Sequence, residues 1–315
     1  MSFAMVFPGQ GSQSLGMQAA LADAFPVVGE TYAEAGEVLG YDLWSLVQDG
    51  PQEELDRTVV TQPAMLTAGI AAWRCWRAAG GPAPAIVAGH SLGEYSALVA
   101  AGALAFGDAL RLVRRRAELM QGAVAEGQGA MAAILGLDDD AVVAVCAEAA
   151  GGQVVTAVNF NAPGQVVIAG DRDAVGRAVD GAKAAGAKRA LLLRVSVPSH
   201  SPLMVPAGEA LAKDLAAAEF ATPALAVLSS VDVERYDAAA RMRAVLEAQV
   251  SNPVRWTDTV QAILAAGQDT LVECGPGRVL TGLGKRIDRS ATHLALEDPD
   301  SLAAALEHCG AGQQD

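Results

Sequence analysis

Short apolar runs alternate with longer amphipathic stretches along most of this chain. Apolar runs of strand length predict buried strands at 1–8, 85–88 and 270–274. Stretches whose apolar residues recur three and four positions apart predict helices at 17–39, 63–79, 108–122 and 242–250. Because strands and helices alternate in this way, we expect an α/β fold.

The middle of the chain has its own pattern, with the element order βαββαβ. The predicted strands lie at 130–137, 153–159, 165–169 and 189–195, the helices at 138–150 and 171–186, and a hairpin loop at 159–164. This order is typical of ferredoxin-like domains and is complete in itself. We therefore predict a ferredoxin-like small domain at 128–197, inserted into a large domain made of 1–127 and 198–315.

Composition and charge exclude several classes of protein. The chain has 315 residues, is 52% hydrophobic and carries a net charge of −14, which argues against nucleic acid as a general partner. Its four cysteines are far apart and include no C-x-x-C pair, so neither a metal site nor a disulfide framework is indicated. No signal peptide is apparent, and no apolar run reaches the roughly 18 residues of a membrane span. We expect a cytoplasmic protein without a membrane partner.

The turn after the run at 85–88 is the first candidate for chemistry. It reads Gly-His-Ser-Leu-Gly at 89–93, which matches the G-x-S-x-G pattern of a nucleophile elbow. Glycines two positions before and after Ser91 leave room for a sharply bent backbone, and the following helix directs free N–H groups at the site. A glycine-rich turn that only packs a helix on a sheet would have the same pattern, although the strand–turn–helix context favours the nucleophile.

A second glycine turn follows the first predicted strand and reads Gly-Gln-Gly-Ser-Gln at 9–13. Its spacing does not match G-x-G-x-x-G, so it does not support a dinucleotide-binding fold. Such a loop could donate a backbone N–H to an oxyanion. A tight turn without any chemical role is an equally good interpretation.

Arg116 lies on the apolar face of the helix predicted at 108–122, whereas Arg114 and Arg115 point elsewhere and can pair with Glu118. A guanidinium that faces the interior needs an anion, because an unpaired buried charge is strongly destabilising. The partner is either an internal carboxylate or the carboxylate of a bound ligand. From the residues alone, the internal carboxylate is the more common case.

Among the four histidines, His200 is the candidate for a catalytic base. It lies on the loop 197–202, where the chain re-enters the large domain, and loops at domain junctions commonly carry function. His90 adjoins the candidate serine, but the sharp turn should aim it away. His293 and His308 fall in a predicted strand and in the last predicted helix.

The helix predicted at 242–250 is stopped by Ser-Asn-Pro at 251–253. Its last carbonyl groups have no partner within the helix. The carbonyl of Gln249 could therefore accept the Nδ1–H of a histidine and fix its tautomer.

Four separated segments together resemble the malonyl-CoA:acyl-carrier-protein transacylase family of the type II fatty acid pathway. They are residues 9–13, residues 89–93, Arg116 before Met-Gln at 120–121, and Ser-His at 199–200. Further matching segments are 159–161, 165–170, Gln249 with Asn-Pro-Val at 252–254, and 275–277. The resemblance covers nearly the whole chain, and it implies an α/β-hydrolase-like large domain with a ferredoxin-like insertion.

The resemblance also implies a role for each candidate residue. Ser91 would be the nucleophile and His200 the general base and then acid, with the backbone carbonyl of Gln249 in place of a triad carboxylate. The backbone N–H groups of Gln10 and Leu92 would form the oxyanion hole.

Arg116 would bind the malonyl carboxylate through two parallel hydrogen bonds. The resemblance therefore favours a ligand carboxylate, rather than an internal one, as the partner of Arg116. Acetyl-CoA would leave this guanidinium unpaired and would therefore be rejected. The implied reaction is a ping-pong transfer of malonyl from malonyl-CoA, through malonyl-Ser91, to the phosphopantetheine thiol of acyl carrier protein. It would supply the extender unit for fatty acid synthesis, and no metal or redox cofactor is expected because a thioester is already activated.

The negative net charge is unfavourable for two anionic substrates, so docking of the carrier protein requires a local positive patch. The candidates are Lys188, Arg189, Lys285 and Arg286. Solvated surface charges without a partner are the alternative interpretation. We expect the chain to act as a monomer.

Three other functions share parts of the pattern. A serine thioesterase or esterase would have the elbow and base, but would rarely carry an arginine on the interior helix face beside the acyl pocket. A non-catalytic binding domain could keep the fold. A related acyltransferase could load methylmalonyl or another extender unit, although Leu92 and residues 197–200 look like the malonyl type, and polyketide systems use similar discrete enzymes.

Overall fold

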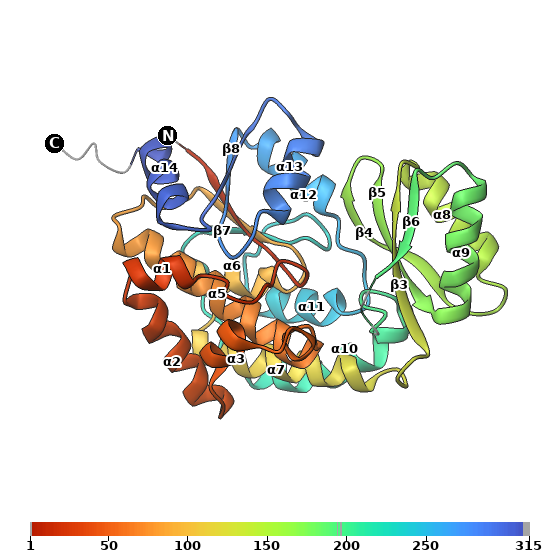
Figure 1. Cartoon of the computed structure of the whole chain (residues 1–315), viewed down its shortest axis with the longest axis horizontal. Coiled ribbons are helices and arrows are strands. Elements are labelled where there is room, and N and C mark those ends of the chain that lie inside the picture. The colour runs from red at the N-terminus through yellow and green to blue at the C-terminus, as the bar shows by residue number, and fades with distance from the viewer. Residues whose placement is uncertain (1, 194, 196, 311–315) are drawn as a thin grey trace.

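The computed structural model describes residues 2–193, 195 and 197–310 and contains two sheets (Figure 1). The larger sheet has five parallel strands in the order β7-β2-β1-β8-β9. Their bounds are β1 Ala4–Phe7, β2 Ile86–Gly89, β7 Ala226–Leu228, β8 Thr270–Glu273 and β9 Thr292–Ala295. An all-parallel sheet must be covered on both faces, and helices supply that cover.

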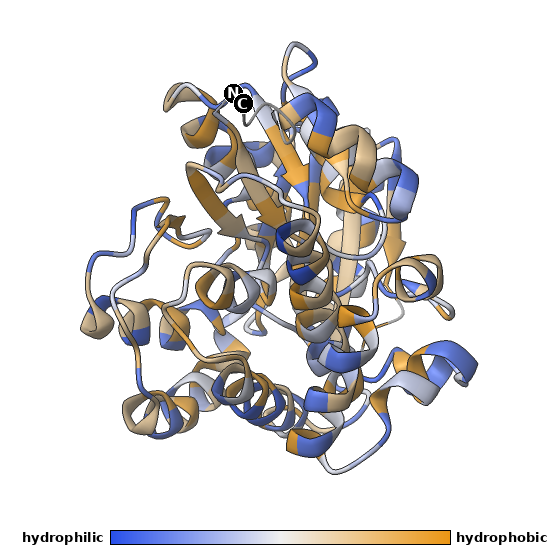
Figure 2. Ribbon diagram, turned by 90° about the vertical axis from the view of Figure 1, so that its left-hand side faces the viewer, coloured by the Kyte–Doolittle hydropathy of each residue, from blue (hydrophilic) through white to orange (hydrophobic). Residues whose placement is uncertain are grey.

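Strand β1 shows why the larger sheet is buried on both sides. Met5 and Phe7 pack into one apolar cluster, with residues of α5 (Thr58–Ala78) and α6 (Gly93–Ala100). Ala4 and Val6 point to the opposite face and pack against residues of the two helices α12 (Trp256–Ala265) and α13 (Val279–Ile287). Figure 2 accordingly shows mostly hydrophobic strands surrounded by helices of mixed character.

The remaining elements of the large unit extend the helical layers. They are α1 Ala19–Ala24, α2 Val27–Leu39, α3 Leu43–Asp49, α4 Gln52–Leu55, α7 Phe106–Gly122, the short 3₁₀ turn η1 Pro202–Met204, α10 Val205–Ala217, α11 Ala239–Gln249 and α14 Pro299–Cys309. Helix α7 packs against both α5 and α10, and α11 packs against α10. Within the described residues, no helix is both long and apolar enough to cross a membrane.

The smaller sheet is antiparallel, with strands in the order β4-β5-β3-β6. Its elements are β3 Gly129–Leu135, α8 Asp139–Ala149, β4 Val155–Ala162, β5 Gln165–Asp171, α9 Arg172–Ala184 and β6 Arg189–Leu192. Helices α8 and α9 cover one face, on the outer side in Figure 1. The predicted α/β class with a ferredoxin-like insertion is confirmed. The boundaries at 128 and 197 stay a prediction, and residues 311–315 of the predicted second large-domain segment lie outside the described residues.

Backbone hydrogen bonds attach the smaller sheet to the large unit. The Val254 N–H donates to the carbonyl of Val158 at 2.8 Å, and the Phe160 N–H donates to the carbonyl of Val254 at 3.0 Å. These bonds join β4 to the segment that precedes α12. The face of the smaller sheet that α8 and α9 leave uncovered is thereby held opposite the end of β2.

The predicted element bounds differ from the structure in several places, and three of the differences are instructive. The helix expected at 17–39 is two helices, because the chain breaks at Pro26, which lacks the N–H that a continuous helix needs. The hairpin loop expected at 159–164 is only two residues long, since Gly164 adopts a φ of 72° that permits a tight turn. The last strand ends at Leu192 rather than Val195, while Arg194 lies outside the described residues.

Candidate functional site

Ser91 sits on a strained turn at the carboxyl end of β2, as the elbow pattern predicts. Its φ is 52°, in the left-handed region that costs a non-glycine residue about 1–3 kcal/mol. The two flanking glycines are required by close backbone contacts. A Cβ on Gly89 would lie 1.9 Å from the backbone of Gly93, and one on Gly93 would lie 2.0 Å from the carbonyl oxygen of Phe7. No side chain larger than hydrogen fits at either position.

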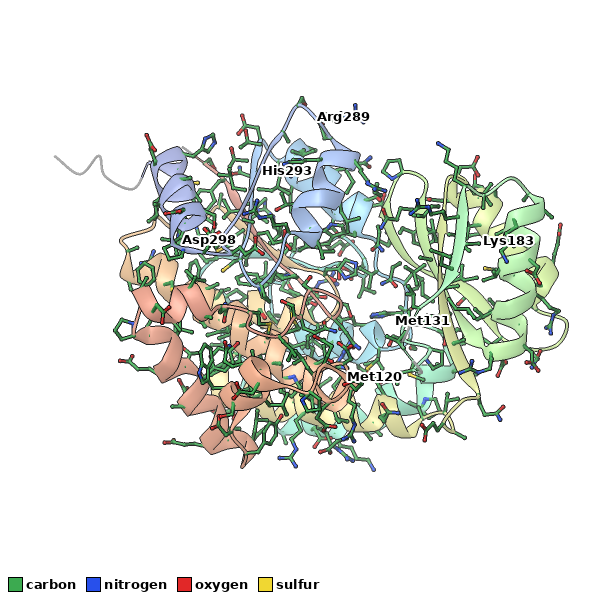
Figure 3. The ribbon with its side chains drawn as sticks, in the orientation of Figure 1. Met120, Met131, Lys183, Arg289, His293 and Asp298 are labelled. Atoms are coloured by element: carbon green, nitrogen blue, oxygen red, sulfur yellow. The ribbon has the colours of Figure 1, made fainter. Side chains whose placement is uncertain are left out.

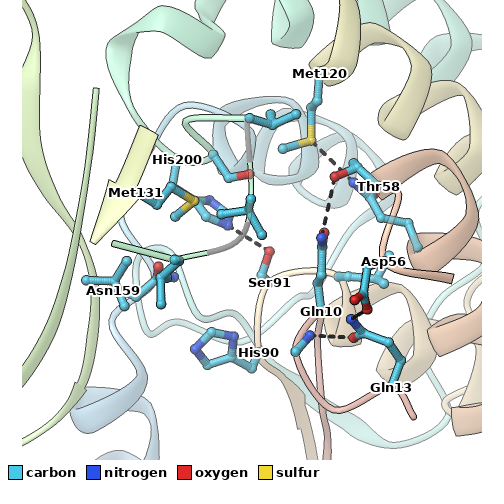
Figure 4. A pocket seen from close by; sticks show the side chains of 18 of the residues that line it. Gln10, Gln13, Asp56, Thr58, His90, Ser91, Met120, Met131, Asn159 and His200 are labelled. Atoms are coloured by element: carbon cyan, nitrogen blue, oxygen red, sulfur yellow. Dashed lines mark hydrogen bonds between the residues drawn. The ribbon is translucent and has the colours of Figure 1, made fainter. Parts of the chain in front are cut away.

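His200 reaches the serine from a loop more than one hundred residues away in sequence. Its Nε2 lies 2.7 Å from the Ser91 Oγ (Figure 4). Its Nδ1 lies 2.7 Å from the backbone carbonyl oxygen of Gln249. A carbonyl can only accept, so Nδ1 carries the proton and Nε2 is left as an acceptor. The imidazole can therefore take a proton from the Ser91 hydroxyl.

Burial keeps the His200 imidazole neutral. The side chain is nearly inaccessible, and this burial, reinforced by the positive charge of Arg116, lowers the pKa of His200 to about 3. The bond from Nδ1 to the Gln249 carbonyl acts in the opposite direction but is the weaker influence. At neutral pH the ring is thus in the form that a general base requires.

Arg116 is 2% exposed, and in the described part of the chain its three hydrogen-bond partners are all neutral. Its Nη1 donates to Gln62 Oε1 at 2.7 Å, and its Nη2 donates to Gln249 Oε1 at 3.1 Å and to Ser91 Oγ at 3.3 Å. Its Nε has no partner among the described residues. This buried cation therefore has spare donor capacity beside the serine, which a ligand carboxylate could use.

The backbone N–H groups of Gln10 and Leu92 are both available. Strands β1 and β2 are parallel neighbours, and Phe7 pairs with Gly89. Gln10 and Leu92 each come three residues later, so both lie beyond the carboxyl ends of these strands. Within the described ranges, neither N–H donates a hydrogen bond. Both residues line the same cavity as Ser91, so their N–H groups are candidates for holding an oxyanion.

These groups line one cavity of about 370 Å³, which lies between the two sheets. Its polar wall carries Ser91, His200 and Arg116, and its apolar wall includes Met131 of β3 and Val167 of β5 from the uncovered face of the smaller sheet. Figure 3 shows Met131 on the smaller sheet and Met120 on α7, and both side chains line this cavity. The space fits a small acyl group with part of a linear arm.

The four predicted docking residues are exposed and lie around one end of the smaller sheet. Arg189 begins β6 and pairs with Leu135 of β3. On its other side, Leu135 pairs with Gln165 of β5. Gln165 Oε1 accepts a hydrogen bond from Arg286 Nη1 at 2.8 Å. The basic pairs 188–189 and 285–286, named as separate candidates from the sequence, therefore lie at the same end of the smaller sheet, with β3 and β5 between them.

Sequence reasoning missed three polar side chains around the site. Gln62 holds Arg116, Glu94 lies buried beneath the serine, and Asn161 Oδ1 lies 2.8 Å from His90 Nε2. His90 also lines the cavity, although its ring is bonded to Asn161 rather than to the serine. Gln62 is one of four polar residues buried in α5, and the helix predicted at 63–79 leaves it out because that helix begins five residues earlier, at Thr58.

Comparisons with known proteins agree with this geometry. The family model described as an acyl transferase domain matches residues 4–298. The malonyl CoA-acyl carrier protein transacylase of Escherichia coli is 57% identical over 305 residues, which cover 97% of this chain and 99% of that protein. The protein of the same name from Bacillus subtilis is 43% identical over 305 residues, which cover 96% of each chain.

Solved structures show the same likeness across the whole chain. A malonyl-transacylase in complex with a type II PKS acyl-carrier protein superposes with a TM-score of 0.97 at 58% identity, covering 98% of this chain and 100% of that one. The malonyl CoA-acyl carrier protein transacylase of Coxiella burnetii also has a TM-score of 0.97, at 50% identity and 98% coverage of both chains.

Proposed function

This chain belongs to the acyl transferase family that includes the malonyl CoA-acyl carrier protein transacylases, and from this premise we propose that it transfers malonyl from malonyl-CoA to the phosphopantetheine thiol of an acyl carrier protein. The observation that carries the proposal is the position of Arg116. A buried cation whose Nε has no partner in the described part of the structure lies beside a serine–histidine pair, in a cavity large enough for an acyl group. The product would serve fatty acid synthesis.

In the proposed first half-reaction, Ser91 Oγ attacks the thioester carbonyl while His200 Nε2 accepts the hydroxyl proton. The bond from the carbonyl carbon to the CoA sulfur breaks, and the leaving sulfur takes the proton from His200. The N–H groups of Gln10 and Leu92 stabilise the oxyanion of the tetrahedral intermediate. The thiol of the carrier protein then attacks malonyl-Ser91 by the same steps in reverse order.

Arg116 would bind the free carboxylate of the malonyl group. Its existing partners are amide and hydroxyl oxygens, so an incoming carboxylate does not have to displace a competing anion. A charge-assisted bond in a buried site is much stronger than one in water. The proposal includes no metal or redox cofactor, because the thioester supplies the activated acyl group. We also propose that the enzyme is cytoplasmic and acts as a monomer.

Intact-mass measurement tests the function directly. Incubation with malonyl-CoA should add one malonyl group to the wild-type chain, and Ser91→Ala should abolish the addition. Adding carrier protein that bears phosphopantetheine should then remove the group from the enzyme and add it to the carrier. Steady release of CoA without carrier protein would instead identify a hydrolase, and no acylation at all would identify a binding domain.

We further propose that the exposed basic residues at the end of the smaller sheet dock the acidic carrier protein. Reversing Lys285 and Arg286 to glutamate should raise KM for carrier protein by about tenfold, because like charges then meet at the interface. The KM for malonyl-CoA should stay nearly unchanged. Steady-state kinetics with each substrate varied in turn measures both values, and equal changes in the two would contradict the docking role.

A further inference from the structure

Glu94 is a buried carboxylate for which the proposed mechanism has no use. It is the second residue of α6, three positions after Ser91, and its exposed fraction is 0%. One carboxylate oxygen accepts from the Tyr236 hydroxyl. The other accepts from Ser230 Oγ at 3.2 Å and from Gln249 Nε2 at 2.5 Å.

The contact between Glu94 and Gln249 fixes which way the amide of Gln249 faces. A carboxylate has no hydrogen to donate, so the NH₂ end of the amide must face it. That same Nε2 also donates to the backbone carbonyl of Ser91 at 3.1 Å. The amide oxygen of Gln249 is thereby turned toward Arg116, whose Nη2 donates to it at 3.1 Å.

Placing a neutral amide between the two charges has a chemical consequence. Glu94 in direct contact with Arg116 would occupy the guanidinium and compete with any incoming carboxylate. With Gln249 between them, the negative charge still stabilises the buried cation through space, while the donors of Arg116 stay available to a ligand. If the Gln249 amide were reversed, its NH₂ group would face the guanidinium, which has no acceptor to offer.

We propose that Glu94 is a positioning residue for acyl selectivity: it orients Gln249 so that Arg116 is held in place for the carboxylate of the acyl group. The inference rests on the proposed function and adds to it a residue that never touches the substrate. Because Glu94 acts through Gln249 on Arg116, its removal should weaken the recognition of a carboxylate-bearing acyl group more than it weakens the reaction at Ser91.

The test compares malonyl-CoA with acetyl-CoA, which lacks the carboxylate. Glu94→Gln keeps the size of the side chain but can offer either a donor or an acceptor to Gln249, so the orientation is no longer enforced. The selectivity ratio, kcat/KM for malonyl-CoA divided by kcat/KM for acetyl-CoA, should fall by about tenfold. The fall should come chiefly from a higher KM for malonyl-CoA. Measurements at pH 8 keep Glu94 ionised in the wild type, because burial raises its pKa to about 7.

Two further variants separate positioning from a general loss of structure. Tyr236→Phe removes a donor from the oxygen of Glu94 that faces away from Gln249. Because the loss of this bond raises the pKa of Glu94, the variant is measured above pH 8, where the ratio should stay within about twofold of wild type. Gln249→Met removes the amide but keeps the backbone carbonyl that contacts His200, and should lower the ratio as Glu94→Gln does. In the double variant the losses should not add, because both residues act in one chain of contacts.

The outcomes also distinguish this inference from the proposed function. A wild-type chain that does not prefer malonyl-CoA would remove the premise itself. A selective wild-type chain with an unchanged ratio in Glu94→Gln, or with fully additive losses in the double variant, would overturn only the role of Glu94. If Glu94→Gln does not fold, Gln249→Met alone decides: an unchanged ratio overturns the inference.

Discussion

Replacing His200 with alanine should slow acylation of Ser91 by about 10²–10⁴-fold, the usual contribution of a general base. The imidazole Nε2 is the group placed to accept the Ser91 proton, at 2.7 Å. A neutral sulfonyl fluoride that modifies active-site serines measures this step without involving Arg116. The rate of modification, followed by intact mass, should fall to near background in the variant.

The same reagent tests the protonation state of His200. Burial and the charge of Arg116 lower its pKa to about 3, so the ring stays neutral, and competent as a base, at every pH well above that value. The wild-type modification rate should therefore stay flat from pH 8 to pH 5 and fall only at more acid pH. In Arg116→Ala the loss of the positive charge should move the inflection upward. An inflection near 6.5 in the wild type would contradict the buried, neutral imidazole.

Replacing Arg116 with alanine should lower kcat/KM for malonyl-CoA by about 10²–10³-fold, because the malonyl carboxylate would enter a buried site without a cation. The value for acetyl-CoA should change far less, since this substrate brings no charge. The reason is that the partners of Arg116 among residues 2–193, 195 and 197–310 are all neutral, so none of them compensates its charge by direct contact. Measuring both substrates over the same concentration range gives the selectivity ratio.

Arg115→Ala is the matched control for this prediction. Arg115 is the adjacent residue of the same helix, but it is exposed and pairs with Glu118 at 3.6 Å and Asp214 at 3.4 Å. Exposed pairs contribute little, so neither substrate should be affected. An equal loss for malonyl-CoA and acetyl-CoA in Arg116→Ala would show that the guanidinium supports the fold rather than the carboxylate.

The parts of the site that were predictable from sequence are those with local signals. The elbow around Ser91 can be recognised from five consecutive residues. Its glycines are required by close contacts within the turn and with the neighbouring strand. Arg116 was recognisable from helical spacing alone, since a charge on an apolar face needs an explanation. The pairing of Ser91 with His200 came from the family resemblance, because nothing local links residues so far apart.

The parts that could not be predicted depend on packing between distant segments. Glu94 follows the elbow directly, yet its role depends on Gln249 of α11 and on Tyr236 of the loop before that helix. The strand predicted at 189–195 is longer than β6, because the three leucines at 191–193 favour a strand that continues. Leu193 still donates its N–H to the carbonyl of Met131 on β3 at 2.9 Å, but its side chain lines the cavity and is 38% exposed.

The two walls of the cavity belong to different units of the chain. Every group that would make or break a bond comes from the larger unit, while Met131 and Val167 of the smaller sheet contribute only shape. Part of the space around the acyl group is therefore encoded in a separate stretch of the gene from the reactive groups and from Arg116. Evolution, or an engineer, can resize the chamber by exchanging residues of the insertion while the reactive centre stays intact.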